Sequence, residues 1–208
     1  LMDEPLSNLD AKLRVQTRAE LIKLHDRIQT TTIYVTHDQV EAMTMGDRIA
    51  VMSLGELQQL DTPQNLYDNP SNKFVAGFIG SPSMNFVDVA LTPEDGGLYA
   101  TTSGFRIKAP KERLRALEPY VGKTVTLGIR PEHLIPRTHP NADTAIPVTV
   151  DVIELLGNEI FVYLMNNGTL LTSRMSPDVK LERGQKIEVV AEPDKIHFFD
   201  KETEAVIR

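Results

Sequence analysis

Cysteine is absent from the sequence, and so is any long hydrophobic run. Without cysteine the chain forms no disulfide bonds, offers no thiolate ligand to zinc and has no cysteine nucleophile. No stretch approaches the roughly 18 consecutive apolar residues that a membrane-spanning helix needs. With 41% hydrophobic and 25% charged residues, the composition is that of a globular protein. We therefore expect any contact with a membrane to come through a partner.

Basic residues are too few to make the surface positive overall. The sequence has 22 Lys and Arg residues against 29 Asp and Glu residues, which gives a formal net charge of −7. Affinity for nucleic acid depends mostly on the neutralisation of phosphates by Lys and Arg. The second half of the chain also lacks the interleaved basic and aromatic residues of a single-strand-binding surface. We expect no nucleic-acid partner.

The beginning of the sequence is unusual. No initiator Met precedes Leu1, and the apolar pair Leu1-Met2 runs directly into two carboxylates, as if a buried strand had been cut midway. We therefore expect the sequence to be a fragment. Its length of 208 residues is comfortable for two domains.

Residues 1 to about 60 alternate helix signals with short β-branched runs, the pattern of an α/β sheet with parallel strands. Ser7 and Asp10 resemble a capping box at the start of a helix over residues 10–29. The residues that fall on one face of this helix are Leu13, Leu21, Leu24 and Ile28. A buried strand is predicted over residues 32–36.

Two further helices and a hairpin are predicted before residue 72. A short helix over residues 38–45 has Val40 and Met43 on its apolar side and ends at Gly46, a candidate left-handed cap. The hairpin has its turn at Gly55. Thr62-Pro63 then opens a helix, because a hydroxyl N-cap precedes a proline at the first helical position, and Asn69-Pro70-Ser71 ends it.

The pattern changes at about Ser81, where short strand-like runs replace helices. Such runs occupy residues 86–91, 124–130, 147–155, 160–164, 170–174, 187–191 and 196–199. Regular short strands separated by turn residues favour a small barrel or sandwich. Gly, Ser and Pro cluster over residues 77–83, which we interpret as a linker. The fold class is therefore α/β plus all-β, with domains over residues 1–80 and 81–208.

Candidate chemistry lies where the apolar strands end. Asp3 and Glu4 follow the first strand, and His37 follows the next one, 34 positions after Asp3. In open α/β sheets this edge holds the ligand crevice, where one carboxylate can hold a metal ion and the other can position water. Taken singly, Asp-Glu-Pro can be an ordinary turn and His37 a hydrogen-bonded turn histidine.

The run from Leu1 to Asp10 resembles one family, the ATPase subunits of ABC transporters. In this resemblance Asp3-Glu4 ends the Walker B strand, residues 7–10 form the D-loop and His37 is the switch histidine. The likeness continues through residues 74–86, typical of maltose-importer ATPases, and through residues 127–133 and 154–159, typical of their OB-fold-like regulatory β-barrel. It covers nearly the whole chain.

The resemblance implies a role for each motif residue. Asp3 would help to hold Mg²⁺, through water, and Glu4 would act as general base on the attacking water. His37 would contact the γ-phosphate of ATP. The D-loop residues, which would face a paired ATPase subunit, are Ser7, Asn8, Leu9 and Asp10. The other implied partners are membrane permease subunits and, indirectly, an external solute-binding protein, with the ATPase peripheral on the cytoplasmic face of the bacterial inner membrane.

Two motifs of that family are absent from these residues. The sequence contains neither a Gly-x-x-x-x-Gly-Lys-Ser/Thr phosphate loop nor the signature Leu-Ser-Gly-Gly-Gln. We therefore predict that the 208-residue chain alone neither binds ATP tightly nor hydrolyses it. We also expect Ile33, Val35, Ile49 and Val51 to lack flanking strands and to favour a dimer or higher oligomer.

Several alternatives stay open. Polyamine, iron and sulfate importers use related ATPases, so the transported solute is not fixed by the motifs. The β domain could act as a separate binding module for a metabolite or an inhibitor. Arg130 and Glu132 are expected to hold a strand-end turn rather than to bind an effector. The histidines that we do not assign as metal ligands are His25, His133, His139 and His197.

Overall fold

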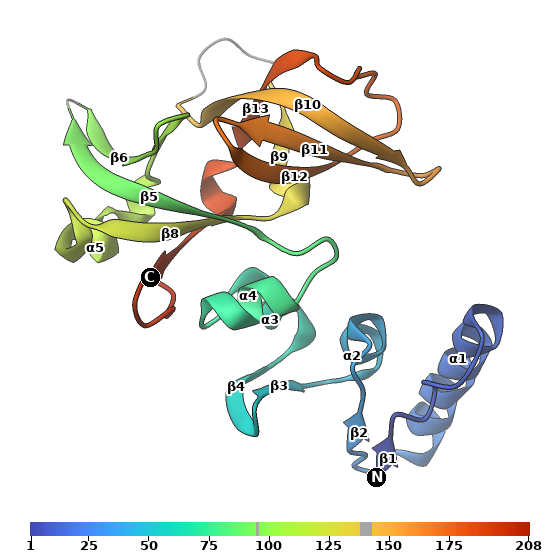
Figure 1. The fold of residues 1–208 in the computed structure, drawn as a ribbon. Coiled ribbons are helices and arrows are strands. Elements are labelled where there is room, and N and C mark those ends of the chain that lie inside the picture. The colour runs from blue at the N-terminus through green and yellow to red at the C-terminus, as the bar shows by residue number, and fades with distance from the viewer. Residues whose placement is uncertain (95, 138–142) are drawn as a thin grey trace. The chain divides into compact units, whose positions relative to one another are not determined.

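The computed structural model describes residues 1–94, 96–137 and 143–208. These residues form two compact units, residues 1–71 and residues 72–208 (Figure 1). The predicted domain boundary at residue 80 stays a prediction about the family architecture. Each unit is described here by itself.

The first unit combines a short parallel sheet, a hairpin and three helices (Figure 1). In chain order the elements are β1 (Met2–Asp3), α1 (Ala11–Ile28), β2 (Tyr34–Val35), α2 (Gln39–Met45), β3 (Ile49–Ser53), β4 (Glu56–Asp61) and α3 (Pro63–Asp68). Strands β1 and β2 are parallel neighbours, and a helix follows each of them. The α/β pattern predicted for this part is therefore present.

Strand β2 is shorter than the predicted strand over residues 32–36, and it is not buried. Among the described residues its one partner strand is β1, and Val35 and the preceding Ile33 are exposed. The prediction of uncovered apolar residues is right for these two positions. It is wrong for Val51, which is buried in the unit, while Ile49 is half-buried.

Helix α1 begins with a single-residue cap rather than with the predicted capping box. The carboxylate of Asp10 accepts a hydrogen bond from the amide of Leu13 at 2.9 Å. The Ser7 hydroxyl is used elsewhere, because it donates to the carbonyl of Glu4 at 2.9 Å. None of the residues of α1 is fully buried.

Helix α2 differs from its prediction in its cap and in its buried face. Gly46 is extended, with φ −85°, so it is not a left-handed cap. Val40 is exposed, and the one buried residue of the helix is Glu41. Hydrophobic periodicity predicted the wrong buried face. The carboxylate of Glu41 can be buried because it accepts hydrogen bonds from two hydroxyl groups, those of Tyr34 and Thr36.

The hairpin and the third helix follow their predictions. Strands β3 and β4 are antiparallel, and Leu54 and Gly55 both have positive φ in the turn, which suits the twist of a tight hairpin. Thr62 caps α3 by accepting from the amide of Asn65, and Pro63 occupies the first turn.

The second unit begins with α4 (Lys73–Phe78), which covers part of the predicted linker. Gly77 and Phe78 end this helix, and Ile79 after it is buried. Ala76 packs against Met84 and Phe199. The interpretation of residues 77–83 as a linker is therefore wrong for its first three residues, because Gly77 and Phe78 belong to α4 and the side chain of Ile79 is buried.

Two five-stranded antiparallel sheets make up the rest of this unit (Figure 1). One has the order β14-β8-β5-β6-β7, with β5 (Asn85–Glu94), β6 (Gly97–Thr101), β7 (Arg106–Lys108), β8 (Thr124–Ile129) and β14 (Ile196–Asp200). The other has the order β12-β11-β10-β13-β9, with β9 (Leu134–Pro136), β10 (Ala145–Leu155), β11 (Ile160–Asn166), β12 (Thr169–Met175) and β13 (Lys186–Ala191). Both sheets contribute to one hydrophobic core, for example through Val89, Leu127, Phe198, Val148, Val162 and Leu171.

All seven predicted strand runs are strands in the structure, whereas β6, β7 and β9 were not predicted. The helical segments of this unit after α4 are short: α5 (Leu114–Leu117) and 3₁₀ turns at Lys111–Arg113, Glu118–Tyr120, Pro131–His133 and Pro193–Lys195. The run Leu156-Gly157-Asn158-Glu159 forms the β10–β11 turn, in which the amide of Leu156 donates to the carbonyl of Glu159.

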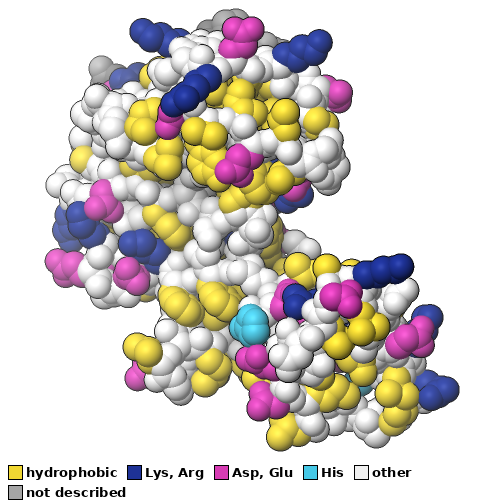
Figure 2. Space-filling view, turned by 45° about the vertical axis from the view of Figure 1, so that its right-hand side comes forward, with side chains coloured by type: hydrophobic (Ala, Val, Ile, Leu, Met, Phe, Trp, Pro, Cys, Tyr) yellow, Lys and Arg dark blue, Asp and Glu magenta, His cyan; other side chains and the backbone are white. Residues whose placement is uncertain are grey.

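Among the described residues, no helix is both long and apolar enough to span a membrane. On the face drawn in Figure 2, Lys and Arg side chains alternate with Asp and Glu side chains, and hydrophobic side chains lie between them.

Candidate functional site at the edge of the parallel sheet

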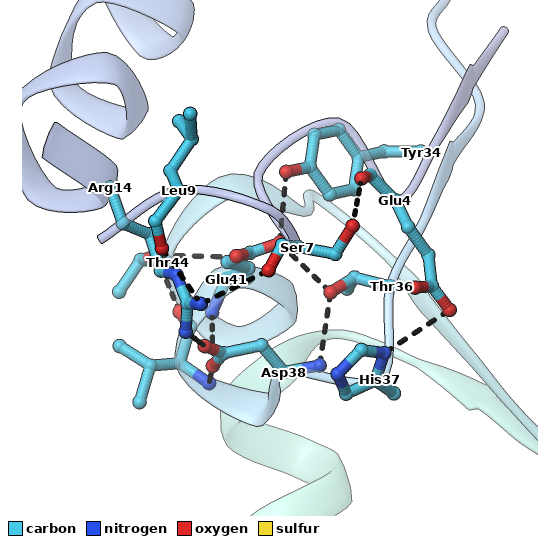
Figure 3. Close-up of polar contacts among 11 residues, drawn as sticks. Glu4, Ser7, Leu9, Arg14, Tyr34, Thr36, His37, Asp38, Glu41 and Thr44 are labelled. Carbon is cyan, nitrogen blue, oxygen red and sulfur yellow. Dashed lines mark hydrogen bonds and ion pairs between the residues drawn. The ribbon is translucent and has the colours of Figure 1, made fainter. Parts of the chain in front are cut away.

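Strands β1 and β2 end at the same edge of their sheet, as the sequence predicted. Asp3 is in register with Val35, and the amide of Glu4 donates to the carbonyl of Val35 at 2.9 Å. Glu4 follows β1 directly, and His37 follows β2 after Thr36, which brings Glu4 and His37 together at this edge (Figure 3).

The carboxylate of Glu4 and the imidazole of His37 form a pair. Nδ1 of His37 lies 3.1 Å from Oε1 of Glu4. The His37 side chain is 74% exposed and the Glu4 side chain 44% exposed, so both can reach a ligand from solvent. A carboxylate beside an imidazole can orient water and contact a phosphate oxygen, which are the tasks that phosphoryl transfer requires.

The backbone of Glu4 adopts a conformation that is uncommon for a residue with a side chain. Its φ is +45°, in the left-handed region. The turn that follows is closed by Ser7, whose amide and hydroxyl both donate to the carbonyl of Glu4. Leu6 within this turn is buried. The turn thus fixes the direction in which the Glu4 carboxylate leaves the strand.

The remaining predicted site residues lie on both sides of this pair. Asp3 is exposed at the end of β1. Asn8 and Asp10 are exposed in the segment before α1, whereas Ser7 and Leu9 are half-buried there. The D-loop segment is therefore a surface element that continues directly from Glu4.

Arg14 was not predicted as a site residue, yet its guanidinium joins two parts of the site (Figure 3). It donates to the carbonyl of Leu9 at 3.2 Å and to that of Ser7 at 3.4 Å. It also lies 3.6 Å from the carboxylate of Asp38, the residue after His37. An arginine one turn into a helix, behind a cap and a surface loop, is the signal that could have identified it.

Glu41 holds the segment that leads to His37, through hydrogen bonds with Tyr34 and Thr36 (Figure 3). Its carboxylate is 2% exposed and accepts from the hydroxyl groups of Tyr34 at 2.9 Å and Thr36 at 2.8 Å. Burial raises the pKa of Tyr34, and the hydrogen bond to Glu41 and its charge raise that pKa further. The signal in the sequence was the spacing of Tyr34 and Thr36, which places both hydroxyl groups on one face of an extended strand.

The fit of these residues to Mg²⁺ can be judged from their chemistry. Asp3 and Glu4 are consecutive carboxylates at the end of β1, and Mg²⁺ prefers oxygen ligands from one or two carboxylates together with water and substrate phosphates. Over the described part of the chain, no group of three potential metal-ligating side chains occurs. The arrangement suits a magnesium ion that is held mainly by water and phosphate, with Asp3 beside it.

The four other histidines do not join this site. His133 Nδ1 lies 2.5 Å from the carboxylate of Glu192, and His197 is buried in β14. His25 is half-buried on α1, and His139 lies outside the described residues. Arg130, expected to pair with Glu132 in a turn, is buried and donates to the carbonyl of Ile79 at 2.7 Å.

Comparisons with known proteins identify the family. A model described as MalK OB fold domain matches residues 80–134, and one described as TOBE domain matches residues 127–199. The oligosaccharides import ATP-binding protein MsmX of Bacillus subtilis is 46% identical over 100% of this chain. The chain belongs to the family of ABC importer ATP-binding proteins. The predicted resemblance and the fold class, α/β followed by an OB-like β structure, are thereby confirmed.

Other relatives of this chain are of the maltose and multiple-sugar type. The trehalose/maltose import protein MalK of Thermococcus litoralis is 48% identical over 98% of the chain, and the multiple sugar-binding transport protein MsmK of Streptococcus mutans is 48% identical over 100%. The chain spans 55–58% of the length of these three relatives. A solved structure of the molybdate-binding protein ModG aligns with 56% of the chain at 20% identity and a TM-score of 0.44.

Proposed function

We propose that this chain supplies the hydrolytic edge and the regulatory β domain of an ATPase that powers an ABC importer for carbohydrates. The observation that carries the proposal is the pair formed by Glu4 and His37, 3.1 Å apart and open to solvent at the end of two parallel strands. Relatives in three organisms, named for oligosaccharides, for trehalose and maltose, and for multiple sugars, support the sugar class, whereas polyamine, iron or sulfate import is the alternative.

In this proposal the residues of the edge divide the chemistry of ATP hydrolysis between them. Glu4 accepts a proton from the water whose oxygen attacks the γ-phosphorus, and the bond to the ADP oxygen breaks. His37 donates to a γ-phosphate oxygen and offsets the negative charge that spreads over the phosphoryl group. Mg²⁺, held beside Asp3, would neutralise phosphate charge when bound. Positioning and electrostatic stabilisation supply most of the catalysis in such reactions.

The proposal needs a phosphate loop and a signature motif, neither of which lies in these 208 residues. A segment joined to this chain or another chain would provide them. Ser7 to Asp10, exposed in part, would then face a paired ATPase subunit, and permease subunits would connect the assembly to the cytoplasmic face of the membrane. The expected dimerisation stays a prediction.

The test is ATPase activity of the full-length product of the gene that encodes this chain. Glu4→Gln should lower kcat by at least about 100-fold, because removal of a general base usually costs that much. His37→Ala should lower it comparably. Glu20→Gln and His25→Ala, both on α1, are matched controls and should keep wild-type turnover. Undiminished activity in Glu4→Gln and His37→Ala would refute the proposal.

A separate binding role of the β domain is the second candidate. It is favoured by the two family models, which together cover residues 80–199 of a unit with its own hydrophobic core. This role would be regulatory and is compatible with the first.

A further inference from the structure

Arg14 holds the D-loop segment from inside α1. One nitrogen of its guanidinium, Nη2, donates to two backbone carbonyls, those of Ser7 and Leu9. These carbonyls lie before the start of α1, where the backbone makes no helical hydrogen bonds of its own. The position of residues 7–9 therefore depends on where the guanidinium is held.

The other end of the same guanidinium meets Asp38. Nη1 of Arg14 lies 3.6 Å from Oδ2 of Asp38, and the two side chains are only 35% and 25% exposed. The Nε atom of Arg14 is buried and has no hydrogen-bond partner among the described residues. A planar fork with several donors can join two carbonyls and a carboxylate at once, whereas a lysine ammonium is a single point of charge.

Asp38 is in turn rigidly fixed to the segment that carries His37. Its carboxylate caps α2 by accepting from the amide of Val40 at 2.8 Å. Its own amide donates to the hydroxyl of Thr36 at 2.9 Å, and that hydroxyl donates to the buried Glu41. The residues on each side of His37 are thus both anchored, so a movement of Asp38 moves the backbone of His37.

We propose that Arg14 is a positioning residue that couples the D-loop segment, residues 7–9, to the His37 side chain. A displacement of residues 7–9 by a paired subunit would pull on the guanidinium and, through Asp38, shift His37 relative to Glu4. This inference rests on the proposed ATPase function. It makes the geometry of the catalytic pair depend on contacts at the D-loop surface, because small misplacements of reacting groups have large effects on rate.

The test uses ATPase kinetics of the full-length gene product with a double-mutant cycle. Arg14→Ala removes the bridge, and Asp38→Asn removes its charge while asparagine still caps α2. Arg14→Ala should lower kcat about tenfold and change KM for MgATP by less than about twofold, the pattern for an interaction made in the transition state. The double variant should be no slower than the slower single variant, because both substitutions break one connection.

Two further variants separate positioning from general effects on the fold. Arg14→Lys should not restore turnover, since an ammonium cannot hold the carbonyls and Asp38 together. Arg27→Ala, an exposed arginine at the other end of α1, should keep wild-type kinetics. All rates are measured well below the melting temperature of every variant.

The outcomes are distinguishable. If Glu4→Gln abolishes turnover but Arg14→Ala keeps it, or if the Arg14 and Asp38 effects multiply independently, the coupling proposal is wrong and the proposed function stands. If Glu4→Gln keeps full turnover, both fall together. A rise in KM with an unchanged kcat in Arg14→Ala would also overturn the coupling, because it would indicate ground-state binding alone.

Discussion

The side-chain amide of Asn85 forms two hydrogen bonds with the backbone of Thr172, one with its amide and one with its carbonyl. Asn85 accepts from the amide of Thr172 at 2.7 Å and donates to its carbonyl at 2.8 Å, and it also donates to the carbonyl of Ile129 at 3.0 Å. Asn85 belongs to one five-stranded sheet and Thr172 to the other. The Asn85 side chain therefore links the two sheets at a position where no backbone hydrogen bonds join their strands.

Asn85→Ala should lower the free energy of unfolding by about 2–4 kcal/mol, because it leaves buried backbone groups without partners. Urea denaturation of the protein, followed by circular dichroism, measures the change. Asn158→Ala is the matched control: Asn158 is exposed in the β10–β11 turn and its φ is not positive, so the substitution should cost less than about 0.5 kcal/mol. If the two substitutions lowered the free energy of unfolding equally, the hydrogen bonds between Asn85 and Thr172 would make no particular contribution to stability.

The half-buried Tyr34, hydrogen-bonded to Glu41, predicts a loss of stability at alkaline pH. Burial and the carboxylate of Glu41 raise the pKa of Tyr34 above its usual value of about 10. Above that usual value the unfolded chain releases the phenolic proton while the native protein keeps it, so stability falls as the pH rises.

Tyr34→Phe should therefore cost about 1–2 kcal/mol at pH 7 and should flatten the decline in stability above about pH 10. The measurement is urea unfolding at neutral and alkaline pH, with phenolate absorbance as a second readout. A decline of the same steepness in the variant and the wild type would contradict the assignment to Tyr34.

His197 predicts the opposite dependence at acidic pH. Burial in β14, aided by the charges of Arg130 and Arg113, lowers the pKa of His197 from 6.5 to about 4. Between these values the unfolded chain binds a proton that the native protein does not, so stability is lost as the pH falls from about 6.5 towards 4.

This loss of stability amounts to at most about 3 kcal/mol, and His197→Gln should remove it from the profile of unfolding free energy between pH 7 and 4. The half-buried His25 offers the control substitution, His25→Gln, which should leave the acidic slope unchanged. Urea unfolding at several pH values measures the slope of the unfolding free energy against pH. If His197→Gln did not reduce this slope, the assignment to the buried His197 would be wrong.

The absence of a phosphate loop predicts how the 208-residue chain behaves by itself. It should release no phosphate from ATP, with magnesium present, above the rate of its own Glu4→Gln variant, because no backbone cradle or lysine is available for the β and γ phosphates. A phosphate-release assay and isothermal titration with MgATP measure both properties. Turnover that Glu4→Gln removes would show that these residues suffice.

The sequence predicted that Glu4 and His37 of the candidate site lie together, because parallel strands end at one edge and these residues each follow such a strand. The same reasoning missed Glu41, since a hydrophobic pattern assigns a buried position to Val40 and an exposed one to a carboxylate. Burial of the charge is possible only because Tyr34 and Thr36 donate to it, and such donors are fixed by tertiary geometry.

In the β unit, long alternating strands were predictable whereas short ones were not. Strand β9, with three residues, is too short to show a period of two, and it forms through its pairing with β13. The end of the helix at Phe78 was hidden for a related reason. Gly, Ser and Pro around residues 77–83 indicate a loop locally, yet the burial of Ile79 depends on strands far along the chain.

The openness of the pair formed by Glu4 and His37 has a consequence for its electrostatics. With the imidazole 74% and the carboxylate 44% exposed, water now weakens the attraction between them. At the same separation, a hydrogen bond to a carboxylate is electrostatically stronger where the effective dielectric constant falls from that of water to that of a protein surface. Any molecule that covers this edge and expels water therefore strengthens the interaction between Glu4 and His37. The electrostatics of the edge change as soon as it is covered, before any residue moves.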